Sequence, residues 1–250
     1  MEAATLGAEL QTLISLPTEP AAVYLVPRGA DRPGRAGFTR LDSHRWCQAL
    51  MRARHGESVR LEGGNCSCPA AAAAFGFKPL PEGLADGTGL VGFGIVRSAE
   101  TGRTMFQGMP RLPFGSCVAI EACPLRSAPA PPDVIVLEGP PESLMWVALA
   151  DLDLDGGARR RADTAVLQAT CVDAVVIPYL ERRLNFSLGC YGCREATDLG
   201  MEETVLGFPG DRLSSIIASL RVLQEKAIPR SRAKAVFRYH QAKENSHERK

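Results

Sequence analysis

Residues 133–152 read DVIVLEGPPESLMWVALADL, and this stretch decides the class of fold. Its first seven residues form a short apolar run rich in β-branched side chains, which predicts a buried strand. Pro140 and Pro141 then open an apolar segment that is long enough for a helix, because proline is tolerated in a first helical turn. The stretch therefore predicts a strand that leads directly into a helix.

The same alternation continues on both sides of this unit. Further strands are predicted at 21–27, 58–63, 89–96, 114–125, 185–190 and 203–208. Further helices are predicted at 6–16, 44–55, 69–77, 164–183 and 212–227. Because strands and helices alternate through most of the chain, the sequence predicts a mixed α/β (α+β) fold.

The composition is that of an ordinary globular protein. The chain has 250 residues, of which 45% are hydrophobic and 23% charged, and its formal net charge is +1. This balance removes the main argument for binding to nucleic acid or to an anionic membrane surface. No apolar run approaches the length of a membrane span, and the first residues, MEAATLGAEL, are acidic where a secretory signal is basic. We therefore expect a cytoplasmic protein that binds neither nucleic acid nor membrane.

Eight cysteines stand out in a chain expected in a reducing compartment, where disulfides are disfavoured. Two close pairs, Cys66 with Cys68 and Cys190 with Cys193, indicate metal or cluster binding, because a turn brings two thiolates to one ion at little entropic cost. Dithiol redox chemistry and inert burial are the alternatives for these pairs.

Two further cysteines lie within the predicted strand 114–125. Cys117 and Cys123 are six residues apart, so a regular strand would place them on one face. We expect both to be buried in the core.

The spacing of the cysteines indicates an internal repeat. Cys47 and Cys66 are 19 residues apart, and so are Cys171 and Cys190. In each half of the chain an apolar segment ending in Pro or Gly precedes a helix with one cysteine. A close cysteine pair and a strand with a Gly-Phe turn follow in the same order.

These flanking similarities predict two similar halves that are packed as one globular unit. The halves span about 8–127 and 132–228, and the Pro-rich loop 128–133 is the expected boundary between them. Residues 229–250 are expected to form a basic, disordered tail. A pseudo-twofold axis between the halves would bring four thiolates together.

Four converging thiolates suit either zinc or an iron–sulfur cluster. Structural zinc usually serves small domains that lack a core, and this chain is long enough to bury one, so we favour a cluster of the 4Fe-4S type and keep zinc as the alternative. Backbone N–H groups at the turn glycines are candidate donors to cluster sulfurs, and Arg194 is a candidate to offset their negative charge. The turn glycines concerned are Gly63, Gly64, Gly189 and Gly192.

Several short motifs also resemble a known family. They are Trp46-Cys47-Gln48-Ala49, Cys68-Pro69-Ala70, Phe75-Gly76-Phe77, Cys171-Val172-Asp173-Ala174, Leu188-Gly189-Cys190-Tyr191-Gly192-Cys193-Arg194 and Gly207-Phe208-Pro209. Together they resemble the uncharacterised ArCR family, a domain of unknown function (family 169), over roughly residues 8–225. The resemblance implies kinship of fold and no established activity.

The resemblance also implies a set of metal ligands. It places one cysteine at each of four positions: Cys47, Cys68, Cys171 and Cys190. In that family the position of Cys193 more often holds a small residue, so Cys66 and Cys193 are expected to be spare thiols near the site.

Three functions agree with these patterns. The first is a cysteine-ligated iron–sulfur protein with an electron-transfer or redox role, acting with a redox partner or on a small-molecule substrate. The second is a thiol-dependent enzyme that uses one reactive cysteine or the Cys190–Cys193 pair. The third is a zinc-stapled structural or partner-binding module. An oxidoreductase activity stays open, and no catalytic residue is assigned.

Overall fold

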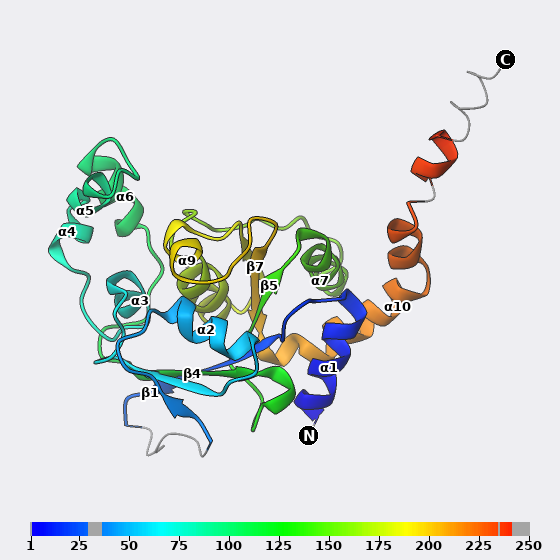
Figure 1. Cartoon of the computed structure of the whole chain (residues 1–250), viewed down its shortest axis with the longest axis horizontal. Coiled ribbons are helices and arrows are strands. Elements are labelled where there is room, and N and C mark those ends of the chain that lie inside the picture. Colours follow the sequence, from blue (N-terminus) through cyan, green and yellow to red (C-terminus); the bar gives the residue numbers. More distant parts are fainter. Residues whose placement is uncertain (1, 30–36, 235, 242–250) are drawn as a thin grey trace.

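A computed structural model describes residues 2–29, 37–234 and 236–241. Within them the chain forms a mixed α/β fold on one seven-stranded sheet (Figure 1). The strands are β1 (Ala21–Pro27), β2 (Thr39–Arg40), β3 (Val59–Glu62), β4 (Cys117–Pro124), β5 (Val134–Gly139), β6 (Asn185–Ser187) and β7 (Thr204–Pro209). The α-helices are α1 (Glu2–Ile14), α2 (Trp46–Arg54), α3 (Pro69–Ala74), α4 (Glu82–Ala85), α5 (Thr88–Gly92), α6 (Ala99–Gln107), α7 (Pro141–Leu154), α8 (Ile177–Glu181), α9 (Tyr191–Ala196) and α10 (Leu213–Arg232). A π-helix, η2 (Ala169–Val176), and two 3₁₀ helices, η1 (Leu125–Ser127) and η3 (Gly210–Arg212), complete the described elements.

The strand and helix predicted at 133–152 are confirmed as β5 followed by α7. The prediction of an extended segment at 89–96 is wrong, because this region begins with helix α5. Gly87 precedes that helix with φ 85°, and a Cβ at this position would lie 2.0 Å from the carbonyl oxygen of Ala99. The glycine-rich segment thus lets α4, α5 and α6 pack closely on one another.

The order of the strands has a pattern that bears on the two halves. The sheet runs β2-β3-β4-β1-β5-β7-β6, and its neighbouring strands are antiparallel except for β2 and β3. The first strand of each half, β1 or β5, lies at the centre, and three residue pairs from Ala21–Val136 to Val23–Val134 join them. Outward from this seam each half presents β4 then β3, or β7 then β6. Three strands on each side of the seam thus follow the same order in one continuous sheet, and β2, at the outer edge of the first half, has no counterpart among the described strands of the second.

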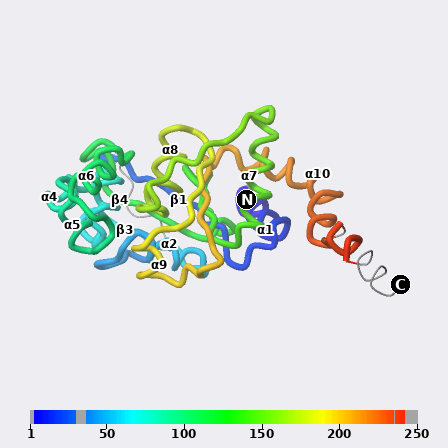
Figure 2. The backbone as a smooth tube through the Cα atoms, turned by 90° about the horizontal axis from the view of Figure 1, so that it is seen from above, coloured from blue at the N-terminus to red at the C-terminus, as the bar shows by residue number. Residues whose placement is uncertain are grey.

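Helices cover both faces of the sheet (Figures 1 and 2). The core on one face contains side chains of α2, α3 and η2, and the core on the other contains side chains of α1, α7 and α10. Helices α4 to α6 lie at one end of the molecule, and α10 projects at the opposite end in both views. No described helix is both long enough and apolar enough to span a bilayer.

Helix α10 extends into the segment that the sequence predicts to be a disordered tail. The helix continues to Arg232, beyond the expected end of the domain at 228, and residues 236–241 are helical as well. The rest of the predicted tail, 242–250, lies outside the described residues.

The two strand cysteines are both buried, as predicted, but the prediction that they share a face is wrong. Cys117 lies in the core beside α2, whereas Cys123 lies in the core beside α1. The pairing of β1 with β4 shifts register between Val26 and Pro27, opposite Ala119 and Cys117. Such an irregularity breaks the two-residue period of a strand, so Cys117 turns to the opposite side.

A buried arginine joins the two halves. Arg54, at the end of α2, is 4% exposed and forms ion pairs with Asp198 at 2.7 Å, Glu203 at 3.1 Å and Glu138 of β5 at 3.5 Å. All three carboxylates belong to the second half. Burial raises the pKa of Glu138 to about 7, even though the charge of Arg54 acts in the opposite direction.

Candidate functional site

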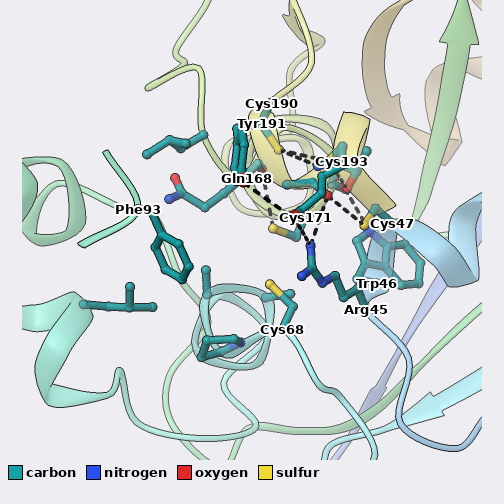
Figure 3. A pocket seen from close by; sticks show the side chains of 18 of the residues that line it. Arg45, Trp46, Cys47, Cys68, Phe93, Gln168, Cys171, Cys190, Tyr191 and Cys193 are labelled. Atoms are coloured by element: carbon teal, nitrogen blue, oxygen red, sulfur yellow. Dashed lines mark hydrogen bonds and ion pairs between the residues drawn. The ribbon is translucent and has the colours of Figure 1, made fainter. Parts of the chain in front are cut away.

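A pocket of about 250 Å³ collects five of the eight cysteines (Figure 3). They come from four separate segments: Cys47 from α2, Cys68 from the start of α3, Cys171 from η2, and Cys190 with Cys193 from the start of α9. All four predicted ligands therefore line one pocket, with two from each half of the chain.

Local structure puts the two turn cysteines in corresponding places. Cys68 follows β3 and is the N-cap of α3, and Cys190 follows β6 and is the N-cap of α9. Both have the extended backbone that a cap residue requires. The Cys190 Sγ also accepts a hydrogen bond from the backbone N–H of Cys193 at 3.4 Å.

The helical cysteines are held by contacts between α2 and η2. The indole Nε1 of Trp46, next to Cys47, donates to the carbonyl oxygen of Thr170, next to Cys171, at 2.9 Å. The helix η2 starts at a strained residue, since Gln168 has φ 58°. π-Helical turns are rare and occur frequently at functional sites.

The distances between the thiols show which of them are in contact. The Sγ atoms of Cys190 and Cys193 are 3.0 Å apart, and Cys193 Sγ lies 3.3 Å from the hydroxyl of Thr170. The sulfurs of Cys68 and Cys171 face each other across the pocket (Figure 3). Within the part of the chain that the structure describes, no three His, Cys, Asp or Glu side chains are grouped so as to hold a metal ion. The site is thus a convergence of thiols without a closed coordination sphere.

The environment of three of these thiols, Cys171, Cys190 and Cys193, raises the pKa and favours the protonated form. Burial and the neighbouring charge of Cys68 raise the pKa of Cys171. A hydrogen bond with Cys193 and burial raise the pKa of Cys190. The bond with Cys190 lowers the pKa of Cys193, but contact with Cys47 and burial outweigh it and raise the value to about 12. A thiol nucleophile needs the opposite shift.

The predicted supporting residues are divided between the pocket and its surroundings. Gly192 lines the pocket, and its carbonyl oxygen lies 4.0 Å from Cys47 Sγ and accepts a hydrogen bond from Arg45 Nη1 at 3.4 Å. Gly189, with φ 90°, packs against Arg194. Arg194 donates to the carbonyl oxygens of Leu188, Gly200 and Glu203, so its guanidinium holds the loops around α9.

The two glycines of the first half lie elsewhere. The backbone N–H of Gly63 donates to the carbonyl oxygen of Val118 at 3.1 Å and is used within the sheet. Neither Gly63 nor Gly64 is among the residues that line the pocket.

The two cysteines expected to be spare differ in position. Cys66 is buried behind the site, where its Sγ lies 3.6 Å from the carbonyl oxygen of Cys68, and burial raises its pKa to about 12. Cys193 instead lines the pocket between Cys190 and Cys47, so it belongs to the site. The spacing of three residues between Cys190 and Cys193 is the sequence signal for this placement.

Other lining residues carried no such signal. The site also contains Arg45, which is paired with Glu195 at 2.9 Å, together with Gln168, Phe93 and Tyr191. Tyr191 lies within the motif 188–194, but nothing in the local sequence distinguishes Arg45, Gln168 or Phe93 from surface residues. They meet the thiols only through the packing of α5, η2 and α9.

The fold and this pocket define a mixed α/β protein with a thiol-lined pocket. The chain belongs to the family described as uncharacterised ArCR, whose model matches residues 9–219. It is 29% identical over 215 residues to an uncharacterized protein of Methanocaldococcus jannaschii, a match that covers 85% of this chain and 91% of that protein. No solved structure matches the chain.

Proposed function

We propose that this protein binds a metal centre, most simply an iron–sulfur cluster, through the thiols of Cys47, Cys68, Cys171 and Cys190. The observation that carries the proposal is the convergence of these four side chains, from four distant segments, on one pocket. Buried cysteines as core filler have no reason to share a pocket, whereas ligands of one centre must do so. Closing the site requires the side chains to turn toward a common point, since no such group is yet formed among the described residues.

The arrangement of the halves supports the same ligand set. In the first half Cys47 lies in a helix between β1 and β3, and Cys68 caps the helix after β3. In the second half Cys171 lies in a helix between β5 and β6, and Cys190 caps the helix after β6. We infer that the halves arose by internal duplication, with Cys47 equivalent to Cys171 and Cys68 to Cys190. This pairing replaces Cys66, whose equal spacing first indicated the repeat, with Cys68.

A bound cluster would supply one-electron chemistry, and its potential is set by burial and by hydrogen bonds to its sulfurs. The chain's own contribution is a mainly apolar pocket, the cap geometry of Cys68 and Cys190, and the cation of Arg45 beside Cys47 and Cys68. All eight cysteines are free, in keeping with a reducing, cytoplasmic compartment. The protein would exchange electrons with a redox partner or with a substrate bound in the pocket.

The test is metal analysis of protein purified without oxygen. Iron and acid-labile sulfide should be present, with broad absorption near about 400 nm and an EPR signal in one oxidation state. Each single replacement by Ser, at Cys47, Cys68, Cys171 or Cys190, should weaken metal binding by more than about tenfold. Cys123→Ser is the matched control, because Cys123 is buried on the other face of the sheet and should leave metal content unchanged.

Two results would contradict the proposal of an iron–sulfur cluster. Full occupancy by zinc without iron would support the zinc-stapled module, in which a chelator unfolds the protein with no redox signal. Unchanged metal content in all four serine variants would remove the ligand set itself.

A dithiol is the second candidate, because the Sγ atoms of Cys190 and Cys193 are only 3.0 Å apart. These two thiols would form a disulfide while a partner disulfide accepts the two electrons and two protons and becomes two thiols. Cys193→Ser should then abolish the exchange, and Cys47→Ser should leave it intact. Loss of metal in Cys47→Ser would instead favour the metal centre.

A further inference from the structure

The pocket has a second wall opposite the thiols. Leu84, Leu90, Phe93 and Phe106, from the segment of α4 to α6, line it with apolar side chains. Two aromatic rings of the lining remain largely open to solvent: Phe93 is 68% exposed and Tyr191 is 53% exposed. Large exposed aromatic side chains at a concave site are typical of ligand contacts.

Gln168 is the polar group that stands out at this end of the pocket. It is 8% exposed and lines the pocket, and Figure 3 shows its terminal amide on the side of Phe93 and Tyr191. Within the described residues no protein group bonds this amide, and it is not among the unpaired side-chain atoms that are sealed from solvent, so it faces the open pocket. Its backbone is held at φ 58° as the residue before η2. The strained backbone and the unpartnered amide at one residue indicate a group that is held ready for a ligand.

The charges around the pocket indicate that this ligand is neutral. Arg45, the cation of the lining, already forms an ion pair with Glu195 at 2.9 Å, and Glu195 lines the pocket too. A ligand carboxylate would have to compete with Glu195 for that guanidinium. A neutral amide meets no such competition at Gln168.

We propose that this outer part of the pocket binds a small, planar, uncharged aromatic amide or lactam as the substrate of the thiol-held centre. The ligand's C=O and N–H would pair with the amide of Gln168, which offers one donor and one acceptor side by side. Its ring would lie against Phe93 and Tyr191, with the sulfurs of Cys68 and Cys171 beyond it. The pocket, about 250 Å³ in all, would also hold the metal centre, so the space left limits the ligand to a single ring. The role of this ligand as a substrate rests on the proposed function, whereas its binding requires no metal.

The experiment is a titration of the full chain, as isolated and after metal removal, with benzamide and 2-pyridone, followed by ligand-detected NMR. Both probes should bind, and Gln168→Met should weaken their binding by about tenfold or more, since it keeps the length of the side chain and removes the amide. Phe93→Ala, at an exposed position that tolerates substitution, should weaken binding by several-fold. Benzoate and toluene should bind at least about tenfold more weakly than benzamide, for lack of a neutral donor–acceptor pair.

Matched controls come from residues outside the pocket. Gln224→Met on α10 and Phe114→Ala, whose ring is 71% exposed, should leave probe binding unchanged. The proposal is overturned if neither amide binds, if toluene binds as well as benzamide, or if Gln168→Met and Phe93→Ala both bind like the wild type. The two proposals fail in different measurements. Cysteine variants that keep their metal would contradict the proposed ligand set, but they would not affect the binding of the probes.

Discussion

Glu138 shows how burial changes the acid–base behaviour of one side chain. Its pKa in the folded protein is raised to about 7 from a usual value of 4.5, mainly by burial. The folded state therefore holds this proton more tightly than the unfolded state does. The stability that follows is fully present below pH 4.5 and is lost as the pH rises through 7.

The unfolding free energy of the wild type should thus fall with pH more steeply than that of Glu138→Gln. The slopes of unfolding free energy against pH should differ between the two proteins by about 1 kcal/mol per pH unit between pH 5 and 7. Urea unfolding at several pH values measures it. Asp173, whose pKa burial also raises to about 7, stays in both proteins and so cancels. Parallel curves for the two proteins would show that Glu138 is ionised throughout this range.

At the scale of elements, β7 and η2 approach so closely that only glycine fits between them. A Cβ on Gly207 would lie 1.9 Å from the carbonyl oxygen of Ala174, a backbone atom of the helix that carries Cys171. Gly207→Ala should therefore destabilise the protein by about 1–3 kcal/mol or more, because one element must move. The melting temperature measures the loss. Gly64→Ala, whose added Cβ meets no atom within 4 Å, is the control and should melt like the wild type.

The sequence predicted the elements whose signal is local and missed those that depend on neighbours. The apolar runs of β1 and β5 are strands wherever they pack, and Pro69 and Pro141 mark helix starts by their fixed φ. The π form of η2 could not be predicted, because the apolar segment 164–183 suits any kind of helix. The face of Cys117 depends on a register shift that involves its partner strand. The segment around α5 has strand-like apolar residues but packs against the helices α4 and α6.

The site follows the same division. The meeting of Cys47, Cys68, Cys171 and Cys190 in one pocket was predictable, because the spacing and motifs of cysteines are informative, whereas their role as ligands stays a prediction. The second wall of the pocket was not, since Phe93, Gln168 and Arg45 are adjacent only after the α4–α6 segment and η2 have packed around α2.

At the scale of the whole molecule, the buried Arg54 network holds the halves together. Arg54→Met should lower the unfolding free energy by about 3–5 kcal/mol, because it leaves Glu138 and Glu203 buried without their cation. The loss should be greater at pH 8 than at pH 5, where Glu138 can bind a proton. Chemical denaturation at both pH values measures this. Arg52→Met, which removes a surface ion pair with Glu57, should change stability by less than about 0.5 kcal/mol, and an equal effect of the two variants would contradict the role of Arg54.

The pocket takes its lining from residues as far apart as Arg45 and Glu195. On the ribosome, its walls cannot be complete until most of the polypeptide has emerged and the later strands have joined the sheet beside β1. Under the proposed function, a metal centre would therefore find all four of its ligands only after the segment with Cys190 has emerged. If the proposal holds, cells that make this protein faster than they assemble such centres would accumulate the metal-free form.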